Sequence, residues 1–229
     1  MVKKKSIIFL ITAVMIFVVI TSLMYQIVVY SSSRSNGYTI VIDAGHGGRD
    51  GGSVGADGSI EKELNLAYSI ELRDKLVENG YKVYMTRSTD DGLYSEFDKN
   101  KKVSDMNKRM EIIKKANPNL VISIHMNSFQ DRSVSGAMTF YRCDDESSRV
   151  VGDLIQKSLK LEGLANTEKS KVGDYFMVNC SYYTSVLIEC GFISNPEEEK
   201  KLITDEHRSK IINAIYHGVL MYFGNYEIV

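Results

Sequence analysis

The sequence has little proline, little cysteine and almost no net charge. The 229 residues include only two prolines and 17 glycines, which excludes a collagen-like or low-complexity chain. The net charge of −1 argues against broad binding of nucleic acid, which requires a basic surface. Apolar residues make up 44% of the chain and charged residues 25%. This composition excludes a disordered chain and one wholly embedded in a membrane, and it predicts a folded domain.

The cysteines are too few and too widely spaced for a metal knuckle. Cys143, Cys180 and Cys190 form no C-x-x-C pair. A zinc site built from cysteines is therefore not expected. Their odd number leaves open one disulfide or none, and we favour the interpretation that they are small buried apolar side chains.

A long run without charged residues, Ile7 to Tyr30, follows three lysines near the N-terminus. This run is long enough to cross a bilayer, and it lacks the polar face of a core helix. The lysines should stay on the cytoplasmic side, which places the rest of the chain outside. Two interpretations stay open: residues 1–30 are a retained signal anchor, which we favour, or a signal peptide cleaved near Ser31–Ser33. Both predict export.

The rest of the chain is predicted to be a short linker, residues 31–37, and one domain, residues 38–229, without internal repeats. Strand and helix patterns alternate along this domain. Predicted strands cover residues 38–43, 81–86, 120–125, 137–141, 175–178 and 185–189. Predicted helices cover residues 64–79, 103–116, 150–161 and 211–222, with a short helix opening at Asn195–Pro196. This alternation predicts an α/β fold, a mostly parallel twisted sheet with helices on both faces.

Polar side chains stand at the ends of three strongly apolar predicted strands. Asp43 ends the first and is followed by His46, while His125 and Glu189 end two others. In open α/β sheets, ligands bind at the carboxyl ends of strands. We therefore expect these side chains to converge on one site.

The residue types at this site are typical of a catalytic zinc centre. Two histidines and a carboxylate form a common zinc set that leaves one position for water. His46 and His125 supply the histidines, and the third ligand is open among Glu61, Glu63 and Asp50. Glu189 suits a general base beside the metal, although a ligand role is also open for it.

The glycine-rich loop that contains His46 does not match a nucleotide-binding motif. In Gly45–Gly52 the third glycine of G-x-G-x-x-G is replaced by Asp50, and no Gly-Lys-Ser/Thr follows. We interpret the glycines as allowing the sharp turn that holds His46 near the metal. H-E-x-x-H and G-x-S-x-G are absent, so neither a zincin nor a serine hydrolase is indicated.

Five sequence blocks, in order, resemble the zinc-dependent N-acetylmuramoyl-L-alanine amidases of bacterial cell walls, the Amidase_3 type. The blocks are Asp43–Gly48 with Asp50–Gly51, Glu61–Lys62 with Leu64–Leu66, Thr86–Arg87, Ser123–Asn127, and Glu189–Asn195. The resemblance extends from Tyr38 to the C-terminus. It implies that His46, Glu61 and His125 hold Zn²⁺ and that Glu189 is the catalytic glutamate.

The same resemblance suggests further residues and shows two departures. Arg87 and Arg109 match recurring arginines, for which a structural and a substrate-orienting role are both open, and Asn127 is a second candidate for substrate binding. Met126 stands where the family usually has a small residue. The usual proline is missing from Tyr182–Ser185. These departures concern substrate contacts and leave the metal set unchanged.

The activity implied is hydrolysis of the amide between the lactyl group of N-acetylmuramic acid and L-alanine in peptidoglycan. A short tethered domain without wall-binding repeats further resembles the sporulation branch, which acts on spore cortex and implies the forespore intermembrane space. Two alternatives stay open: a zinc peptidase that cuts within the stem peptide, and a non-catalytic binding domain. Beyond peptidoglycan, the expected partners are the membrane, if the N-terminal segment is retained, and an exported targeting protein.

Overall fold

The computed structural model describes residues 12–22, 24, 35–179 and 182–224. The chain divides into two compact units, Met1–Gly37 and Tyr38–Val229. In the first unit, residues 12–22 and 24 are helical and exposed. Across the described residues, no helix combines the length and the apolar character that crossing a membrane requires. The predicted signal segment and linker fall largely on residues outside the described ranges.

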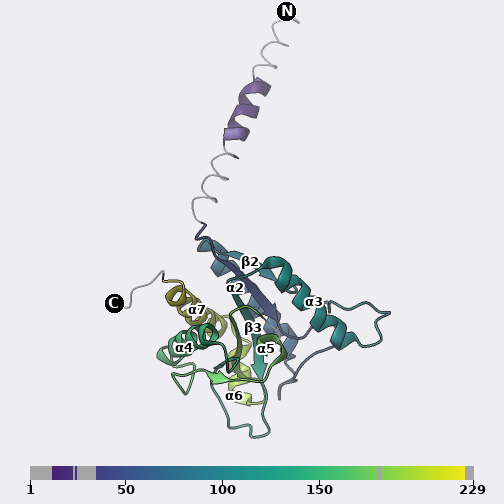
Figure 1. The fold of residues 1–229 in the computed structure, drawn as a ribbon, viewed down its shortest axis with the longest axis vertical. Helices are drawn as coiled ribbons and strands as arrows, with labels where there is room; N and C mark the ends of the chain where they lie inside the picture. The colour runs from purple at the N-terminus through teal and green to yellow at the C-terminus, as the bar shows by residue number, and fades with distance from the viewer. Residues whose placement is uncertain (1–11, 23, 25–34, 180–181, 225–229) are drawn as a thin grey trace, which may run out of the picture. The chain divides into compact units, whose positions relative to one another are not determined.

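The second unit is built on one sheet (Figure 1). Among the described residues six strands form it, in the order β2-β1-β3-β6-β4-β5. Each neighbouring pair is parallel except β4–β6, which is antiparallel, so the sheet is mixed. The strands are β1 Thr39–Ala44, β2 Lys82–Met85, β3 Leu120–Asn127, β4 Met138–Tyr141, β5 Lys171–Val172 and β6 Ser185–Phe192.

Helices cover both faces of this sheet, as the sequence predicts. One face packs against α2, α4 and α7, and the other packs against α3 and α5. Figure 1 shows α4 and α7 side by side. The helices are α2 Glu61–Glu78, α3 Lys101–Ala116, α4 Glu146–Leu161, α5 Phe176–Asn179, α6 Pro196–Leu202 and α7 Asp205–Tyr222.

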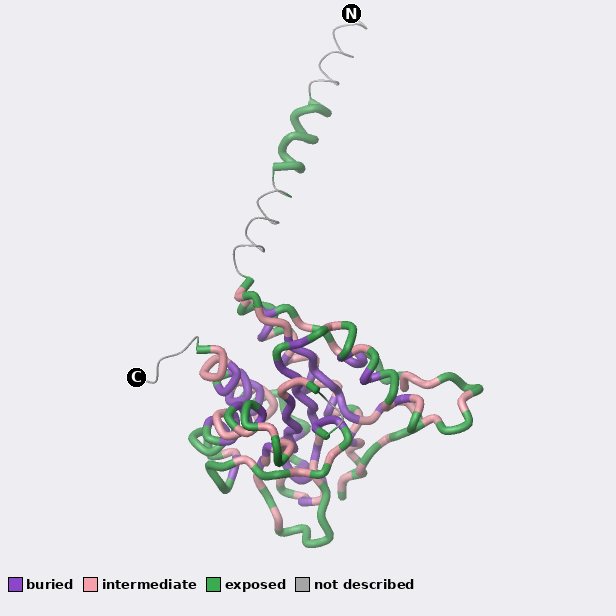
Figure 2. Tube along the Cα trace, in the orientation of Figure 1, coloured by how far each residue is buried: buried purple, intermediate pink, exposed green. Residues whose placement is uncertain are grey.

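The central strands are apolar on both sides because successive side chains point to opposite faces. Ile40 and Ile42 of β1 join the larger core under α2, whereas Val41 between them packs with Ile113 of α3. The strands at the centre of the sheet are buried along nearly their whole length (Figure 2). The core therefore fixes the register, and with it the side chains that leave the strand ends.

The predicted strand at residues 175–178 is wrong, because this segment forms the short helix α5, Phe176–Asn179. The carbonyl of Tyr175 accepts bonds from the N–H groups of Val178 at 3.2 Å and Asn179 at 3.0 Å, which is a helical turn. A short apolar run does not distinguish a strand from a buried helical turn. The edge strand β5, which precedes this helix, has only two residues, too few for an alternating apolar pattern to predict it.

The described cysteines differ in exposure. Cys143 is exposed and Cys190 is buried, and both are free thiols. Burial raises the pKa of the Cys190 thiol well above its usual value. Cys190 is thus the small buried apolar side chain that the sequence favoured, whereas Cys143 is not. Cys180 lies outside the described residues.

Candidate active site

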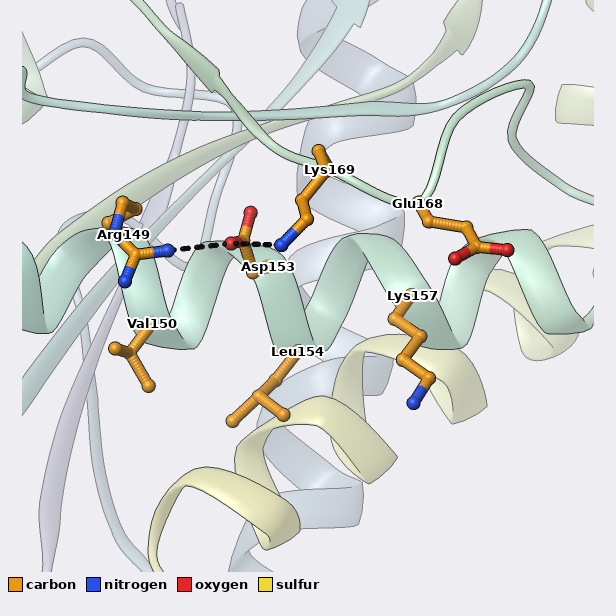
Figure 3. A pocket seen from close by; sticks show the side chains of 7 residues that line it. All are labelled: Arg149, Val150, Asp153, Leu154, Lys157, Glu168 and Lys169. Atoms are coloured by element: carbon orange, nitrogen blue, oxygen red, sulfur yellow. Dashed lines mark hydrogen bonds and ion pairs between the residues drawn. The ribbon is translucent and has the colours of Figure 1, made fainter.

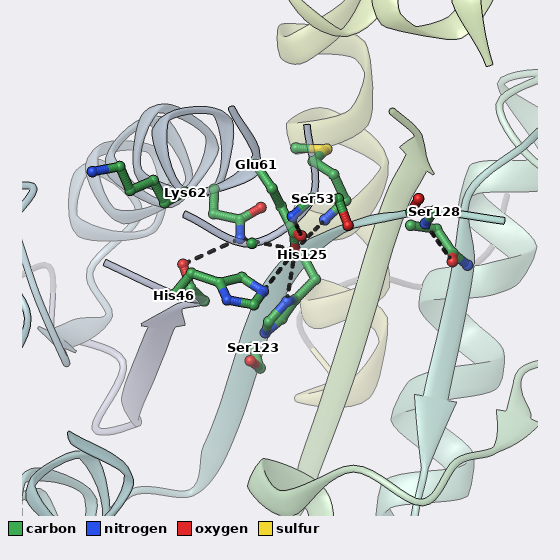
Figure 4. Close-up of polar contacts among 12 residues, drawn as sticks. His46, Ser53, Glu61, Lys62, Ser123, His125 and Ser128 are labelled. Atoms are coloured by element: carbon green, nitrogen blue, oxygen red, sulfur yellow. Dashed lines mark hydrogen bonds and ion pairs between the residues drawn. The ribbon is translucent and has the colours of Figure 1, made fainter. Parts of the chain in front are cut away.

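Parallel pairing of β1, β3 and β6 brings the predicted site residues to one edge of the sheet. His46 follows the end of β1, and His125 lies near the end of β3. Glu189 of β6 is the register partner of His125. Glu61, the first residue of α2, reaches the same edge from above the sheet (Figure 4). Four side chains that are distant in sequence therefore meet.

The two histidines and Glu61 place their donor atoms at metal-binding spacing. Glu61 Oε1 lies 3.1 Å from His46 Nε2 and 3.0 Å from His125 Nδ1. One donor atom from each side chain lies within 4.8 Å of the others. Donors in a tetrahedral zinc site, with bonds of about 2.0–2.2 Å, stand about 3.3 Å apart. The set fits such an ion with small movements.

Glu61 and His46 each stabilise the charged form of the other, and His125 also stabilises the charged form of Glu61. Burial alone would raise the pKa of Glu61, but His125 and His46 hold it well below its usual value. Burial alone would lower the pKa of His46, yet contacts with Glu61 and Asp50 raise it. Glu61 is thus held as a carboxylate, the form in which it binds metal.

The structure separates Glu61 from the two rival acids. Asp50 Oδ1 lies 3.0 Å from His46 Nδ1, the ring nitrogen on the side away from Glu61. Asp50 therefore lies beside the ring nitrogen opposite the donor atom and is not one of the three donor residues. Glu63 is exposed. Of the three acids, only Glu61 joins the donor set.

Backbone and amide groups hold the Glu61 carboxylate in place. The N–H of Ser53 donates to Oε2 at 2.8 Å. The Asn65 side chain and the N–H of Met126 donate to Oε1, both at 3.3 Å. The sequence offers no signal for Ser53, because its role depends on how the glycine-rich loop folds over α2, whereas Asn65 lies one helical turn after Glu61 in α2.

Two buried arginines hold the loop that carries His46. His46 has φ of 61°, a left-handed conformation that costs free energy outside glycine. Arg109 donates to the carbonyls of Ala44 at 2.7 Å and His46 at 2.5 Å. Arg87 donates to the carbonyls of Ala44 and Gly45, each at 2.9 Å. Three successive carbonyls thus turn inward onto guanidinium groups.

These contacts favour the structural role for both arginines over the substrate-orienting one. Arg109 has no exposed surface and Arg87 is 4% exposed. The remaining donors of Arg87 bond to the carbonyls of Thr89 at 3.0 Å and Lys62 at 2.8 Å. Both guanidinium groups are buried and bonded mainly to groups of the protein itself.

Asp43 is the buried anion that balances Arg109. Its carboxylate accepts bonds from Arg109 at 2.7 Å, Thr86 at 2.8 Å and Ser123 at 2.7 Å. Burial alone would raise the pKa of Asp43, but the charge of Arg109 and these hydrogen bonds hold it below its usual value. Asp43, the carboxylate at the end of the first predicted strand, therefore holds Arg109, which in turn holds the loop that carries His46.

Glu189 is a buried carboxylate without a hydrogen-bond partner for one oxygen. The residue is 7% exposed, and its Oε2 makes no hydrogen bond to a described residue. Burial raises the pKa of Glu189 to about 7, with the charge of Glu61 acting in the same direction. A carboxylate with a pKa near neutral can both accept and return a proton.

Asn127 does not join this group. Its side-chain oxygen accepts the N–H of Ser128 at 2.8 Å. Asn127 lines a separate hollow of about 210 Å³ together with Phe192 of β6 and Phe140 of β4. His46 and His125 do not line that hollow. Asn127, two residues after His125 in β3, therefore lines a neighbouring hollow and is not one of the three donor residues.

Comparison with known proteins identifies the family. The sequence pattern of the N-acetylmuramoyl-L-alanine amidases of the Amidase_3 type matches residues 40–221. The chain belongs to this family. It is an amide hydrolase of peptidoglycan, and the family resemblance seen in the sequence is confirmed at this level.

Relatives and solved structures agree with this assignment. The germination-specific N-acetylmuramoyl-L-alanine amidase of Bacillus subtilis is 37% identical over 193 residues, covering 82% of this chain and 81% of the relative. The CwlD amidase of Clostridioides difficile, solved in complex with the GerS lipoprotein, is 36% identical with a TM-score of 0.79. That match covers 83% of this chain and all of the other. The CwlV catalytic domain from Bacillus (Paenibacillus) polymyxa is 27% identical, with a TM-score of 0.72 and coverage of 82% and 98%.

Proposed function

We propose that this amidase is zinc-dependent, with His46, Glu61 and His125 as ligands and Glu189 as the general base. The observation that carries the proposal is the meeting of the three donor atoms beside a buried, unpartnered carboxylate. Zinc bound in such a set supplies Lewis acidity, because it polarises a carbonyl and lowers the pKa of water to about 7.

Glu189 handles the protons of the reaction. It accepts a proton from the water whose oxygen attacks the lactyl carbonyl carbon of N-acetylmuramic acid. It then returns that proton to the L-alanine nitrogen as the C–N bond breaks. Burial raises the pKa of Glu189, which makes its carboxylate a better proton acceptor than an exposed one. The products are a free lactyl carboxylate and a stem peptide with a free amino end.

We further propose that the substrate is the peptidoglycan of the spore cortex. The support is the similarity to a germination-specific amidase of Bacillus subtilis, at 37% identity over most of both chains. This setting requires export, for which the apolar run after the N-terminal lysines provides the signal, as an anchor or a cleaved peptide. Residues 38–229 would then form the exported catalytic domain.

A protein partner is the remaining part of the proposal. The solved CwlD amidase is in complex with the GerS lipoprotein, and it is 36% identical to this chain. We expect this amidase to bind an exported protein as well, and co-purification from sporulating cells tests that expectation.

Mass spectrometry of digested cortex tests the function. The expected products are intact stem peptides that begin with a free L-alanine, together with glycan that carries peptide-free muramic acid. Zinc content of the purified chain is measured in parallel. Cleavage within the stem peptide would contradict the amidase assignment, and full activity after chelation would contradict the proposed zinc dependence.

A further inference from the structure

A fully buried carboxylate on α6 has no role in the mechanism so far. Glu199 has no exposed surface, although glutamate is seldom buried without a partner. Its two oxygens accept the backbone N–H groups of Asp57, at 2.8 Å, and of Ser59, at 3.0 Å. Both donors belong to residues 53–60, the loop that leads into α2, which we call the clamp loop. Glu199 thus ties α6 to a loop from a distant part of the sequence.

The bonds from the clamp loop hold Glu199 as an anion. Burial alone would raise the pKa of Glu199, but the N–H groups of Asp57 and Ser59 hold it below its usual value. Hydrogen bonds to a charged acceptor are roughly twice as strong as those between neutral groups. A Cβ atom built on Gly55 would lie inside contact distance of Glu199 Oε1, so the loop also packs directly on this carboxylate. Charge and shape together fix the tip of the clamp loop.

The base of the clamp loop holds the third candidate ligand. The N–H of Ser53 donates to Glu61 Oε2 at 2.8 Å, and the N–H of Glu61 donates to the carbonyl of Ser53 at 3.0 Å. Between this base and the tip, Val54 and Ile60 form an antiparallel bridge. Because this bridge joins the two arms of the loop, a shift of the tip is carried to Ser53 and to the carboxylate that it holds.

The Ser53 bond determines which oxygen of Glu61 faces the histidines. Oε2 accepts the Ser53 N–H, whereas Oε1 lies 3.1 Å from His46 Nε2 and 3.0 Å from His125 Nδ1. A carboxylate that offers one oxygen to a metal leaves room for the water that a catalytic zinc site requires. The position of the clamp loop therefore bears on how this site would hold zinc.

Helix α6 is a firm support for the clamp loop because it is also tied to β6, the strand that carries Glu189. Glu198, the neighbour of Glu199, accepts the N–H of Phe192 at the end of β6 at 2.8 Å. The Asn195 side chain accepts the N–H of Glu198 at 3.2 Å and so caps the start of α6. The strand of the proposed base and the loop of the third candidate ligand thus share one support.

We propose that Glu199 is a positioning residue of this amidase: it holds the clamp loop so that the Ser53 N–H occupies Oε2 of Glu61 and leaves Oε1 for zinc. This inference rests on the proposed zinc dependence, because it concerns how the third candidate ligand is presented to the metal.

An acid on α4 anchors a different loop and provides a matched control (Figure 3). Asp153 accepts the N–H of Ser170 at 3.0 Å, and it contacts Arg149 at 3.0 Å and Lys169 at 3.4 Å. Like Glu199, Asp153 ties a helix to a loop, but its loop carries none of the three candidate zinc ligands. Loss of either carboxylate should lower the stability of the fold, whereas only loss of Glu199 should weaken zinc binding.

Zinc affinity of the full chain, measured by competition with a chromogenic chelator, tests the proposal. Glu199→Gln keeps the size of the side chain but replaces one acceptor oxygen with a donor and removes the charge. We expect zinc to bind about 10–100-fold more weakly, the usual effect of losing a group that orients a ligand. Asp153→Asn and Glu197→Gln, the latter at an exposed position of α6, should both keep the wild-type affinity.

Urea denaturation with and without zinc separates positioning from simple support of the fold. Bound zinc stabilises the folded chain by an amount that its affinity sets. Asp153→Asn should therefore lower the free energy of unfolding equally in both forms. Glu199→Gln should lower it more in the zinc-loaded form than in the metal-free form.

The outcomes separate this proposal from the zinc dependence on which it rests. A wild-type chain that binds no zinc would overturn both. Zinc binding by the wild type with equal affinity in Glu199→Gln, or with the same loss of affinity in Asp153→Asn, would overturn the positioning role alone. If Glu199→Gln does not fold, Gly55→Ala disturbs the same contact from the loop, and unchanged zinc affinity in that variant would overturn the proposal.

Discussion

Glu189 is the side chain whose surroundings define the proposed chemistry most sharply. Glu189→Gln keeps the shape of the side chain but cannot accept a proton. We expect turnover on peptidoglycan to fall by about 10²–10⁴-fold, the usual contribution of general acid–base catalysis, while zinc content stays unchanged. Glu63→Gln makes the same change at an exposed position and should leave both quantities unaltered. Normal turnover in Glu189→Gln would exclude this residue as the base.

Gly45 is the residue that leaves room for His125. A Cβ atom built on Gly45 would lie 2.3 Å from the imidazole ring, far inside contact distance. Gly45→Ala should therefore displace His125 and weaken zinc binding by about 10–100-fold, as loss of ligand support commonly does.

Competition with a chromogenic chelator measures this affinity. Gly51→Ala is the matched control in the same loop, because its Cβ would lie at an ordinary 3.4 Å from Ile60. Equal zinc affinity in the two variants would show that the histidine does not need the space at Gly45.

The sequence predicts the site residues at the strand ends, but it does not determine which acid is the third candidate ligand or which groups hold that acid. His46, His125 and Glu189 follow apolar strands, so parallel pairing alone brings them together. Helical periodicity does not choose between Glu61 and Glu63 in the first turn of one helix. That choice depends on the loop over α2, whose Ser53 N–H holds the Glu61 carboxylate at 2.8 Å.

Helices and strands with a strong apolar pattern were predictable. The short helix α6, Pro196–Leu202, was also predictable, because Asn195 and Pro196 mark its start, but a short segment without such a signal was not. The predicted helix at residues 103–116 lies within α3, Lys101–Ala116, because its apolar positions share one face. The segment at 175–178 carries too few residues to show a period, and its structure is set by the turn at Tyr175. The pairing direction of β4 against β6 depends on the connection and not on the residues of the strand.

Helix α3 supports the His46 loop through Arg109. Arg109→Ala leaves the buried carboxylate of Asp43 without its cation and removes the hydrogen bonds to the carbonyls of Ala44 and His46, of which only the Ala44 carbonyl keeps a bond from Arg87. Loss of one partner of a buried pair costs about 3–5 kcal/mol, so the free energy of unfolding should fall by that amount. Urea denaturation measures it.

An exposed pair on another helix provides the comparison for Arg109. Arg149→Ala removes contacts with Glu146 and Asp153 on the surface of α4 and should lower the free energy of unfolding far less than Arg109→Ala does. A loss of similar size for both variants would mean that Arg109 does not act as a buried support.

Asp43 joins several elements of the domain through one carboxylate. It lies in β1 and accepts hydrogen bonds from Thr86 after β2, Ser123 in β3 and Arg109 in α3. The edge of the sheet that carries the site is therefore tied to the stability of the whole domain. Sequence patterns do not reveal this role, since each of these residues is an unremarkable polar side chain when considered alone.

The free energy of unfolding of the domain should accordingly depend on pH through the ionisation of Asp43. Its folded pKa lies below the unfolded value of about 3.9, so the charged form is favoured by folding. The stabilisation is fully present above about pH 4 and is lost as the pH falls through the folded pKa. Urea denaturation from about pH 6 to about pH 2 should therefore show Asp43→Asn much less stable than wild type at the upper end, with the difference shrinking at the lower end. Asp144→Asn, at an exposed position, should follow the wild-type curve throughout. A difference between wild type and Asp43→Asn that stays constant with pH would show that the charge of this carboxylate is not what stabilises the fold.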